Sequence, residues 1–134
     1  MIILRFTKAM EYGMIILCHL GHKSKERVSA REITKSEHLP HAFTQRILQE
    51  LLRSGLVDSR RGVSGGYTLS RDPKDITLFE IHDALEGEID LISFFEERVE
   101  EYGDDSSKSL HKGMDKLHEH IIVEFQKMKL SDFM

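Results

Sequence analysis

The stretch Arg61-Gly62-Val63-Ser64-Gly65-Gly66 decides the fold, because it separates two short runs of strand-like residues, 56–60 and 67–70. Its three glycines permit the positive φ angles that a tight hairpin tip requires. The sequence therefore predicts a two-stranded hairpin, which we call the wing. Arg60 and Arg61 suit contact with a phosphate backbone or insertion into a narrow minor groove. An ordinary hairpin with a solvated tip is the alternative.

Two helices joined by a short turn are predicted directly before the wing. Ser29 followed by Glu32 is a capping-box pattern, and it starts a helix that should stop near residues 35–36. Pro40 suits the first position of the next helix, which Ser54-Gly55 ends. The apolar residues Phe43, Ile47, Leu48, Leu51 and Leu52 give this helix a buried face. The pair predicts a helix-turn-helix whose second helix lies in the major groove, although a generic helical hairpin has a similar pattern.

Polar residues at the start of that second helix, together with the wing, form the predicted DNA-binding site. These residues are positioned to approach bases or phosphates, and glutamine can form a bidentate hydrogen bond with adenine. The predicted DNA-contacting residues are His41, Thr44, Gln45, Arg46, Arg60, Arg61, Gly62, Ser64, Gly65 and Gly66.

An amphipathic helix is predicted before these elements, over residues 7–20. Thr7 suits its N-cap and Gly21 its C-cap. Its apolar face has helical spacing and consists of Met10, Met14, Leu17 and Cys18.

A second apolar stripe runs along the C-terminal segment with spacing close to a heptad. It consists of Leu110, Met114, Leu117, Ile121, Phe125 and Met128. A single stripe on a long helix needs a second surface, which either a partner chain or the chain's own N-terminal helix can provide. A homodimer would present two recognition helices and would expect a near-palindromic target.

Charge is divided unevenly along the chain. Residues 1–71 hold 12 Lys and Arg against 6 Asp and Glu, whereas residues 72–134 hold 7 against 17. A basic segment on an acidic remainder is typical of a DNA-binding head on an oligomerising body. Chance clustering of surface charge is the alternative.

Length and composition exclude several classes of protein. A chain of 134 residues is too short for two large domains. The longest apolar run, residues 14–18, is far too short to cross a bilayer, so a cytoplasmic protein is expected. Cys18 is the only cysteine and cannot form a disulfide within the chain or a thiolate metal cage. The glycine loop does not match a nucleotide-binding motif, and no catalytic motif is found, so we expect no enzyme.

Several motifs resemble the winged helix-turn-helix regulators that include the iron-sulfur assembly regulator, the nitric-oxide-sensing repressor and the cysteine-metabolism repressor. They are Leu4-Arg5-Phe6-Thr7 with Tyr12, the Glu32-Ile33 helix, the string Leu51-Leu52-Arg53-Ser54-Gly55-Leu56-Val57, the RGxxGGYxL wing at 61–69, and the helix ending in ALEG at 84–87. The resemblance is strong to Gly87 and holds in outline afterwards.

This resemblance implies a fold that is mainly α with a small β-hairpin, in which the third helix reads DNA and the wing flanks it. Residues 1–87 would form the DNA-binding domain. Residues 88–134 would form a linker and a long dimerisation helix, packed with the N-terminal helix.

The chain departs from this family at the cofactor site. Many members hold an iron-sulfur cluster with three cysteines after the ALEG segment, and residues 88–112 contain none. No cofactor and no metal are therefore expected. The alternative is a cluster with unusual ligands, Glu11 with His111 or His118, although such ligands hold a cluster poorly.

The sequence thus predicts a homodimeric, sequence-specific DNA-binding regulator that represses by occupying a promoter. Its partners would be double-stranded DNA, a second copy and no membrane. The signal it senses is left open between a small molecule, a protein partner and oxidation of Cys18. The alternative function is an effector-sensing or protein-interaction module that kept the fold without DNA binding.

Overall fold

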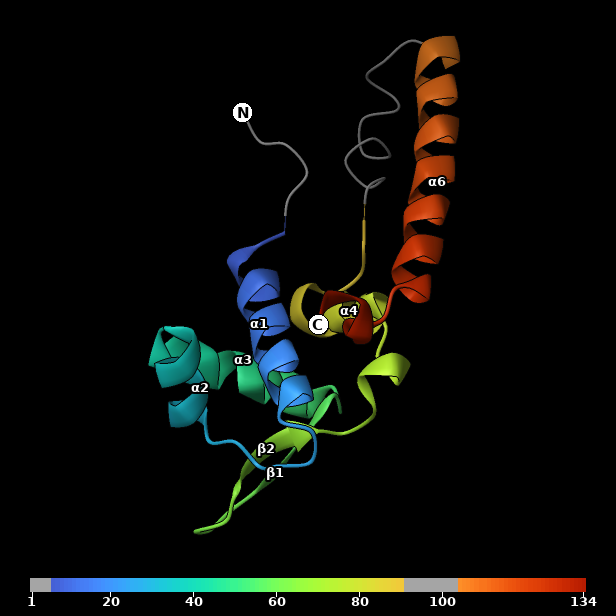
Figure 1. Cartoon of the computed structure of the whole chain (residues 1–134). Coiled ribbons are helices and arrows are strands. Elements are labelled where there is room, and N and C mark those ends of the chain that lie inside the picture. Colours follow the sequence, from blue (N-terminus) through green and yellow to red (C-terminus); the bar gives the residue numbers. More distant parts are fainter. Residues whose placement is uncertain (1–5, 91–103) are drawn as a thin grey trace.

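In the computed structural model, which describes residues 6–90 and 104–134, the described residues form mainly helices, with a two-stranded hairpin that projects from one edge (Figure 1). The elements are α1 (Lys8–His22), α2 (Ala30–Glu37), α3 (His41–Arg53), β1 (Val57–Arg60), β2 (Gly66–Leu69), η1 (Pro73–Asp75), α4 (Leu78–Glu86), α6 (Asp104–Lys127) and η3 (Leu130–Phe133). The predicted fold class, mainly α with a small β-hairpin and a long C-terminal helix, is confirmed. None of the helices in this described part is both long and apolar enough to cross a membrane.

Helix α1 begins as predicted but ends later. The Thr7 hydroxyl accepts a hydrogen bond from the Met10 amide at 3.3 Å, as an N-cap does. The prediction that Gly21 is the C-cap is wrong, because α1 continues to His22. A Cβ at Gly21 would lie 2.7 Å from the methyl carbon of Met134, so glycine here permits close packing by the C-terminus.

Helices α2 and α3 form the predicted pair with small differences at their ends. The Ser29 hydroxyl accepts from the Glu32 amide at 3.1 Å, and α2 runs to Glu37, slightly beyond the predicted stop. His38 then adopts a left-handed conformation with φ of 56° and turns the chain towards α3. The prediction that Pro40 is the first helical residue of α3 is wrong by one position. Pro40 is the N-cap, and the helix begins at His41.

The hairpin has the predicted strands, and β2 makes a second contact. Arg60 pairs with Gly66 at the end of the ladder next to the tip. On its other side Tyr67 exchanges two backbone hydrogen bonds with Val28, of 2.8 and 2.9 Å. Gly66 has a φ of 131°, and a Cβ there would lie 2.8 Å from the Val28 carbonyl. The wing is therefore tied to the segment that leads into α2.

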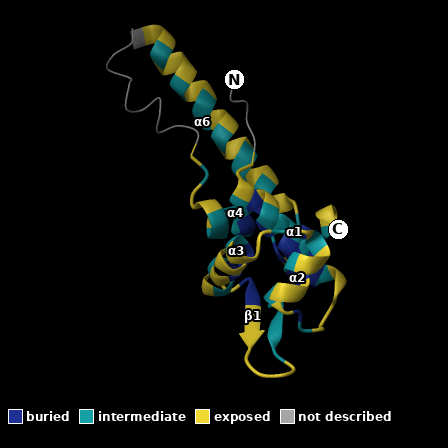
Figure 2. Ribbon diagram, turned by 90° about the vertical axis from the view of Figure 1, so that its left-hand side faces the viewer, coloured by how far each residue is buried: buried dark blue, intermediate teal, exposed yellow. Residues whose placement is uncertain are grey.

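The core lies where α1 packs against α3 and α4, with α2 on the flank of α3 (Figures 1 and 2). It is built from the apolar faces of all the head elements. Its fully or almost fully buried residues are Met10, Ile16, Leu17, Leu20, Val28, Ile33, Ile47, Leu48, Leu51, Leu56, Val57, Ile76, Leu78, Ile81 and Leu130. Burial of these side chains supplies the main stabilisation of the head.

The C-terminal end of the chain returns to the head. The Leu78 amide donates to the Met128 carbonyl at 2.9 Å, and η3 packs against α1. Helix α6 contacts α4 near its C-terminal end, and its other end projects away from the head (Figure 1). The C-terminal residues meet the N-terminal helix at η3, and the packing of the long dimerisation helix on the N-terminal helix stays a prediction. The ring of Phe125 also meets that of Phe6, with centroids 6.3 Å apart.

Much of the predicted apolar stripe on the C-terminal segment stays accessible. Leu110 is 50% exposed and Leu117 is 47% exposed, whereas Met114, Ile121 and Phe125 are half-buried. The division of the chain at Gly87 stays a prediction, since residues 91–103 of the second segment lie outside the described residues.

Candidate nucleic-acid interface

Helix α3 turns a polar face outward along its N-terminal half. His41, Gln45 and Arg46 are all exposed, as predicted, whereas Ile47 and Leu48 on the opposite face are buried. The Thr34 hydroxyl of α2 lies 3.4 Å from Nδ1 of His41 and so joins the two helices at the start of this face. The exposed side chains are donors and acceptors of the kinds that read base edges and phosphates.

Thr44 does not belong to this face. The prediction that it is exposed is wrong: its side chain is fully buried, and its hydroxyl has no hydrogen-bond partner in the structure. Residues 44, 47, 48 and 51 follow the i, i+3, i+4, i+7 spacing of one helical face, so Thr44 completes the buried stripe. Its polar character concealed that position in the sequence.

The structure adds Gln49 to the exposed face. Gln49 follows His41 and Gln45 at intervals of four, and all three are exposed. Residues four apart lie on the same side of a helix. The spacing was the sequence signal for this residue, which the predicted site did not include.

The tip of the wing presents the predicted arginines to solvent. Arg60 and Arg61 are exposed, and within the described part of the chain neither forms an ion pair. Gly62, with a φ of 108°, and Ser64 are also exposed, so residues 60–64 of the wing are accessible to solvent. Two unpaired guanidinium groups on a narrow hairpin suit phosphates or the minor groove.

The other two glycines of the wing have packing roles. A Cβ at Gly65 would overlap the carbonyl oxygen of Arg60, and a Cβ at Gly66 would meet the backbone of Val28. Both glycines are half-buried. Their predicted contact with DNA stays a prediction, and the close backbone approaches explain why glycine is needed there.

The residues present do not fit an iron-sulfur cluster. Cys18 offers one thiolate, while Glu11 pairs with Lys8 at 3.2 Å and His111 pairs with Asp115 at 3.3 Å along α6. In residues 6–90 and 104–134, no group of three His, Cys, Asp or Glu lies close enough to hold a metal ion. Carboxylate and imidazole are poor replacements for the thiolates that such clusters require.

Comparison with known proteins gives one family and several relatives. The profile of the Rrf2 family, described as "Iron-dependent Transcriptional regulator", matches residues 6–134. The HTH-type transcriptional regulator CymR of Bacillus subtilis is 33% identical over 64% of this chain and 63% of its own length. The HTH-type transcriptional regulator IscR of Cereibacter sphaeroides is 35% identical over 56% of this chain and 50% of its own. In four of the curated relatives, the match covers between 53% and 63% of the relative's length, which is less than two thirds.

Solved structures agree with this comparison over nearly the whole chain. The structure of T. potens IscR is 25% identical, has a TM-score of 0.73 and covers 97% of this chain and 85% of its own. The structure of CymR, the global cysteine regulator of B. subtilis, is 24% identical and has a TM-score of 0.72. The match covers 98% of this chain and 96% of the CymR chain. The second likeness shows the fold alone.

Proposed function

The chain belongs to the Rrf2 family of transcriptional regulators, and on this premise we propose that it is a sequence-specific DNA-binding regulator that acts as a homodimer. The family is one of regulators and not of enzymes. The observation that carries the proposal is the exposed polar face of α3 together with an arginine-bearing wing, which the pairing of Tyr67 with Val28 ties to the segment leading into α2.

In the proposed complex α3 enters the major groove, with Gln45 and Gln49 facing base edges. Arg60 and Arg61 then lie along the phosphates or in the adjacent minor groove, where positive charge is favoured. The positive excess of residues 1–71 attracts DNA to this face. Bound at a promoter, the protein represses by occupying it.

The homodimer forms along α6. Leu110 and Leu117 are large apolar side chains, each about half exposed on a helix that projects from its own head. Such a face needs a partner, and a second α6 offers the same stripe. The two-fold dimer presents two α3 helices to successive major grooves, so its target is a near-palindrome.

We further propose that the regulator works without an iron-sulfur cluster, although the family description names iron. The support is the donor set, since the single thiolate of Cys18 cannot replace three. The signal must then reach the protein through another site.

Binding-site selection from a pool of genomic fragments tests the proposal. We expect the purified protein to enrich fragments that share a near-palindromic motif with half-sites about one helical turn apart. The double variant Arg60→Ala with Arg61→Ala should enrich the same motif more weakly. Recovery of random fragments, or of none, by the folded protein would favour the module that kept the fold without DNA binding.

A further inference from the structure

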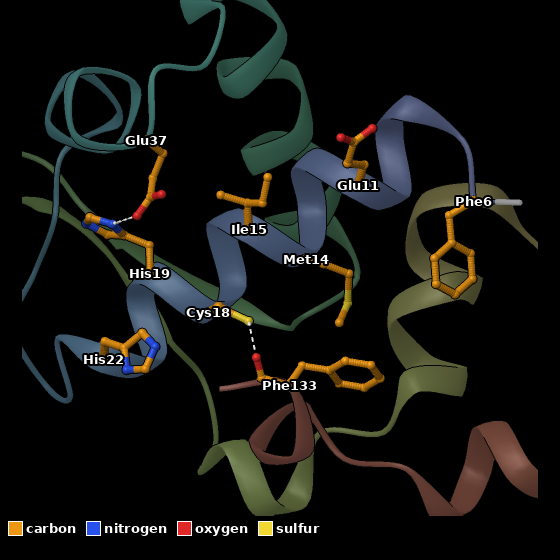
Figure 3. A pocket seen from close by; sticks show the side chains of 9 residues that line it. All are labelled: Phe6, Glu11, Met14, Ile15, Cys18, His19, His22, Glu37 and Phe133. Carbon is orange, nitrogen blue, oxygen red and sulfur yellow. Dashed lines mark hydrogen bonds and ion pairs between the residues drawn. The ribbon is translucent and has the colours of Figure 1, made fainter.

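A pocket of about 670 Å³ opens beside α1, and its lining includes none of the residues that the DNA complex would use (Figure 3). Helix α1 forms one wall, Glu37 at the end of α2 forms another, and Phe133 of η3 forms a third. Small-molecule sites commonly have volumes of about 300–1,000 Å³. The pocket therefore has the size of a binding site for a small molecule.

The lining combines an apolar middle with acidic ends. Met14, Ile15 and Phe133 provide apolar surface, and Glu11 and Glu37 provide carboxylates at different ends (Figure 3). No lysine or arginine is among the described residues that line it. With histidine counted as neutral at pH 7, the charge of the lining is negative, which favours a cation over an anion.

Glu37 is the carboxylate at the end of the pocket near His19. It is only 34% exposed, and its Oε1 lies 2.7 Å from Nδ1 of the buried His19. Burial raises the pKa of the Cys18 thiol, and the negative charge of Glu37 raises that pKa further. The charge of Glu37 thus acts across the pocket on a neighbouring side chain of α1.

We propose that this pocket binds a small organic cation, an amine with an apolar body, whose ammonium group pairs with the carboxylate of Glu37. The apolar body lies along Met14 and Ile15, and the ring of Phe133 covers it. An ammonium–carboxylate hydrogen bond in a partly buried site is stronger than a neutral one. The apolar contacts add affinity for a hydrocarbon or aromatic body.

The position of Glu37 couples the pocket to the DNA-binding face, a step that rests on the proposed function. Glu37 is the last residue of α2, and the left-handed His38 leads from it into the turn before α3. An ammonium group competes with His19 for the carboxylate and so weakens the link between α1 and α2. Because this link positions the turn before α3, we expect the bound amine to lower the affinity of the protein for its operator. The two sites would then be coupled through Glu37.

Titration calorimetry with three compounds of similar shape tests the site without DNA. The probes are 2-phenylethylamine, the neutral 2-phenylethanol and the anionic 3-phenylpropanoate. We expect the amine to bind at least about tenfold more tightly than the alcohol, as a charge-assisted pair contributes. We expect the anion to bind most weakly.

Two matched variants locate the ammonium group. Glu37→Gln keeps a hydrogen-bond acceptor for His19 and should weaken amine binding at least about tenfold, to the level of the alcohol. Glu11→Gln removes the same charge from the other end, eight residues from His19 and so about 12 Å along the helix. It should change amine affinity less than about threefold. Circular dichroism confirms that both variants are folded.

Three results would overturn the proposal: equal binding of amine and alcohol, tighter binding of the anion, or no binding of any probe. The proposal would also be overturned if the pocket held part of a second copy of the chain. In that case the amine would not bind, and Glu37→Gln would change the oligomeric state measured by sedimentation. Failure of the proposed function looks different. The amine would bind and depend on Glu37, while the protein would select no DNA motif.

Discussion

The backbone amide of Leu130 donates to the carbonyl of Ile76 at 2.8 Å, and the side chain of Leu130 is fully buried. This contact sets the last residues of the chain beside the residues that start α4. The adjacent bond between Leu78 and Met128 makes the junction a short antiparallel pairing. The C-terminal end is therefore part of the core of the head and is needed for its stability.

Replacing Leu130 should destabilise the head strongly. Leu130→Ala removes a fully buried side chain, so we expect a loss of about 2–5 kcal/mol in the free energy of unfolding. Urea denaturation followed by circular dichroism measures it. Val123→Ala is the control, because Val123 is 44% exposed on α6 and outside the apolar stripe. Similar losses in both variants would show that Leu130 does not belong to the core.

The two positive-φ glycines of the wing should differ in their tolerance of alanine. At Gly62 a Cβ meets open space, so Gly62→Ala costs only backbone strain of about 1–2 kcal/mol. At Gly66 the same strain is joined by a clash with the Val28 carbonyl. Gly66→Ala should therefore lower the melting temperature further and also weaken DNA binding by displacing the wing. Identical effects of the two changes would contradict this role of Val28.

The two neighbours Thr44 and Gln45 should behave in opposite ways. Gln45→Ala should relax base preference at one position in each half-site, where a bidentate contact discriminates by roughly 1–3 kcal/mol. Thr44→Val removes a buried hydroxyl that has no partner, so it should preserve base preference and leave stability equal or higher. Binding-site selection with each variant reads the preference. An unchanged motif for Gln45→Ala would reject this residue as a base contact.

The wing arginines should act through salt-dependent electrostatics. Each phosphate neutralised contributes about 0.9 to the slope of log affinity against log salt, so Arg60→Ala with Arg61→Ala should reduce it by about 2 per wing engaged. Specific and non-specific DNA should be affected alike. Lys116→Ala with Lys127→Ala removes the same charge from exposed positions on α6 and should leave the slope nearly unchanged. A constant slope with lower stability would make the arginines structural.

Protein purified without oxygen should be colourless and free of stoichiometric iron. The reason is the donor set, in which Cys18 is the single cysteine and Glu11 already pairs with Lys8. Absorption spectra with iron and sulfide assays measure the content. A brown preparation whose iron is lost in Glu11→Ala would instead support the cluster with carboxylate and imidazole ligands.

Elements whose signals are local could be predicted from the sequence. The N-caps Thr7 and Ser29 each bond an amide three residues ahead, so a short stretch contains the whole interaction. The wing has the same property, because its strands pair across a tip of only five residues, 61–65. Three residues of the exposed face, His41, Gln45 and Arg46, could likewise be predicted from the start of α3.

Features that depend on distant residues could not be predicted. Gly21 looks like a helix end until Met134 packs against it, and Thr44 looks like a surface residue until α3 is rotated onto the core. The pocket beside α1 joins His19, Glu37 and Phe133, which no short stretch contains. The contact at Gly21 and the pocket follow from tertiary packing and leave no periodic signal, whereas Thr44 does lie at the spacing of the buried stripe and was concealed by its polar side chain.

The pairing of Tyr67 with Val28 also bears on how such proteins diverge. It brings the two ends of the segment 28–67 within hydrogen-bonding distance, so that everything facing DNA lies between two adjacent points of the chain. A segment with neighbouring ends can be exchanged between homologous genes without moving the ends of the flanking chain, provided that its buried face still packs against α1 and α4. Recombination at these points would change which promoters are recognised while assembly along α6 stays that of the recipient. Glu37 would travel with the exchanged segment, so the pocket beside α1 would combine walls from both parents.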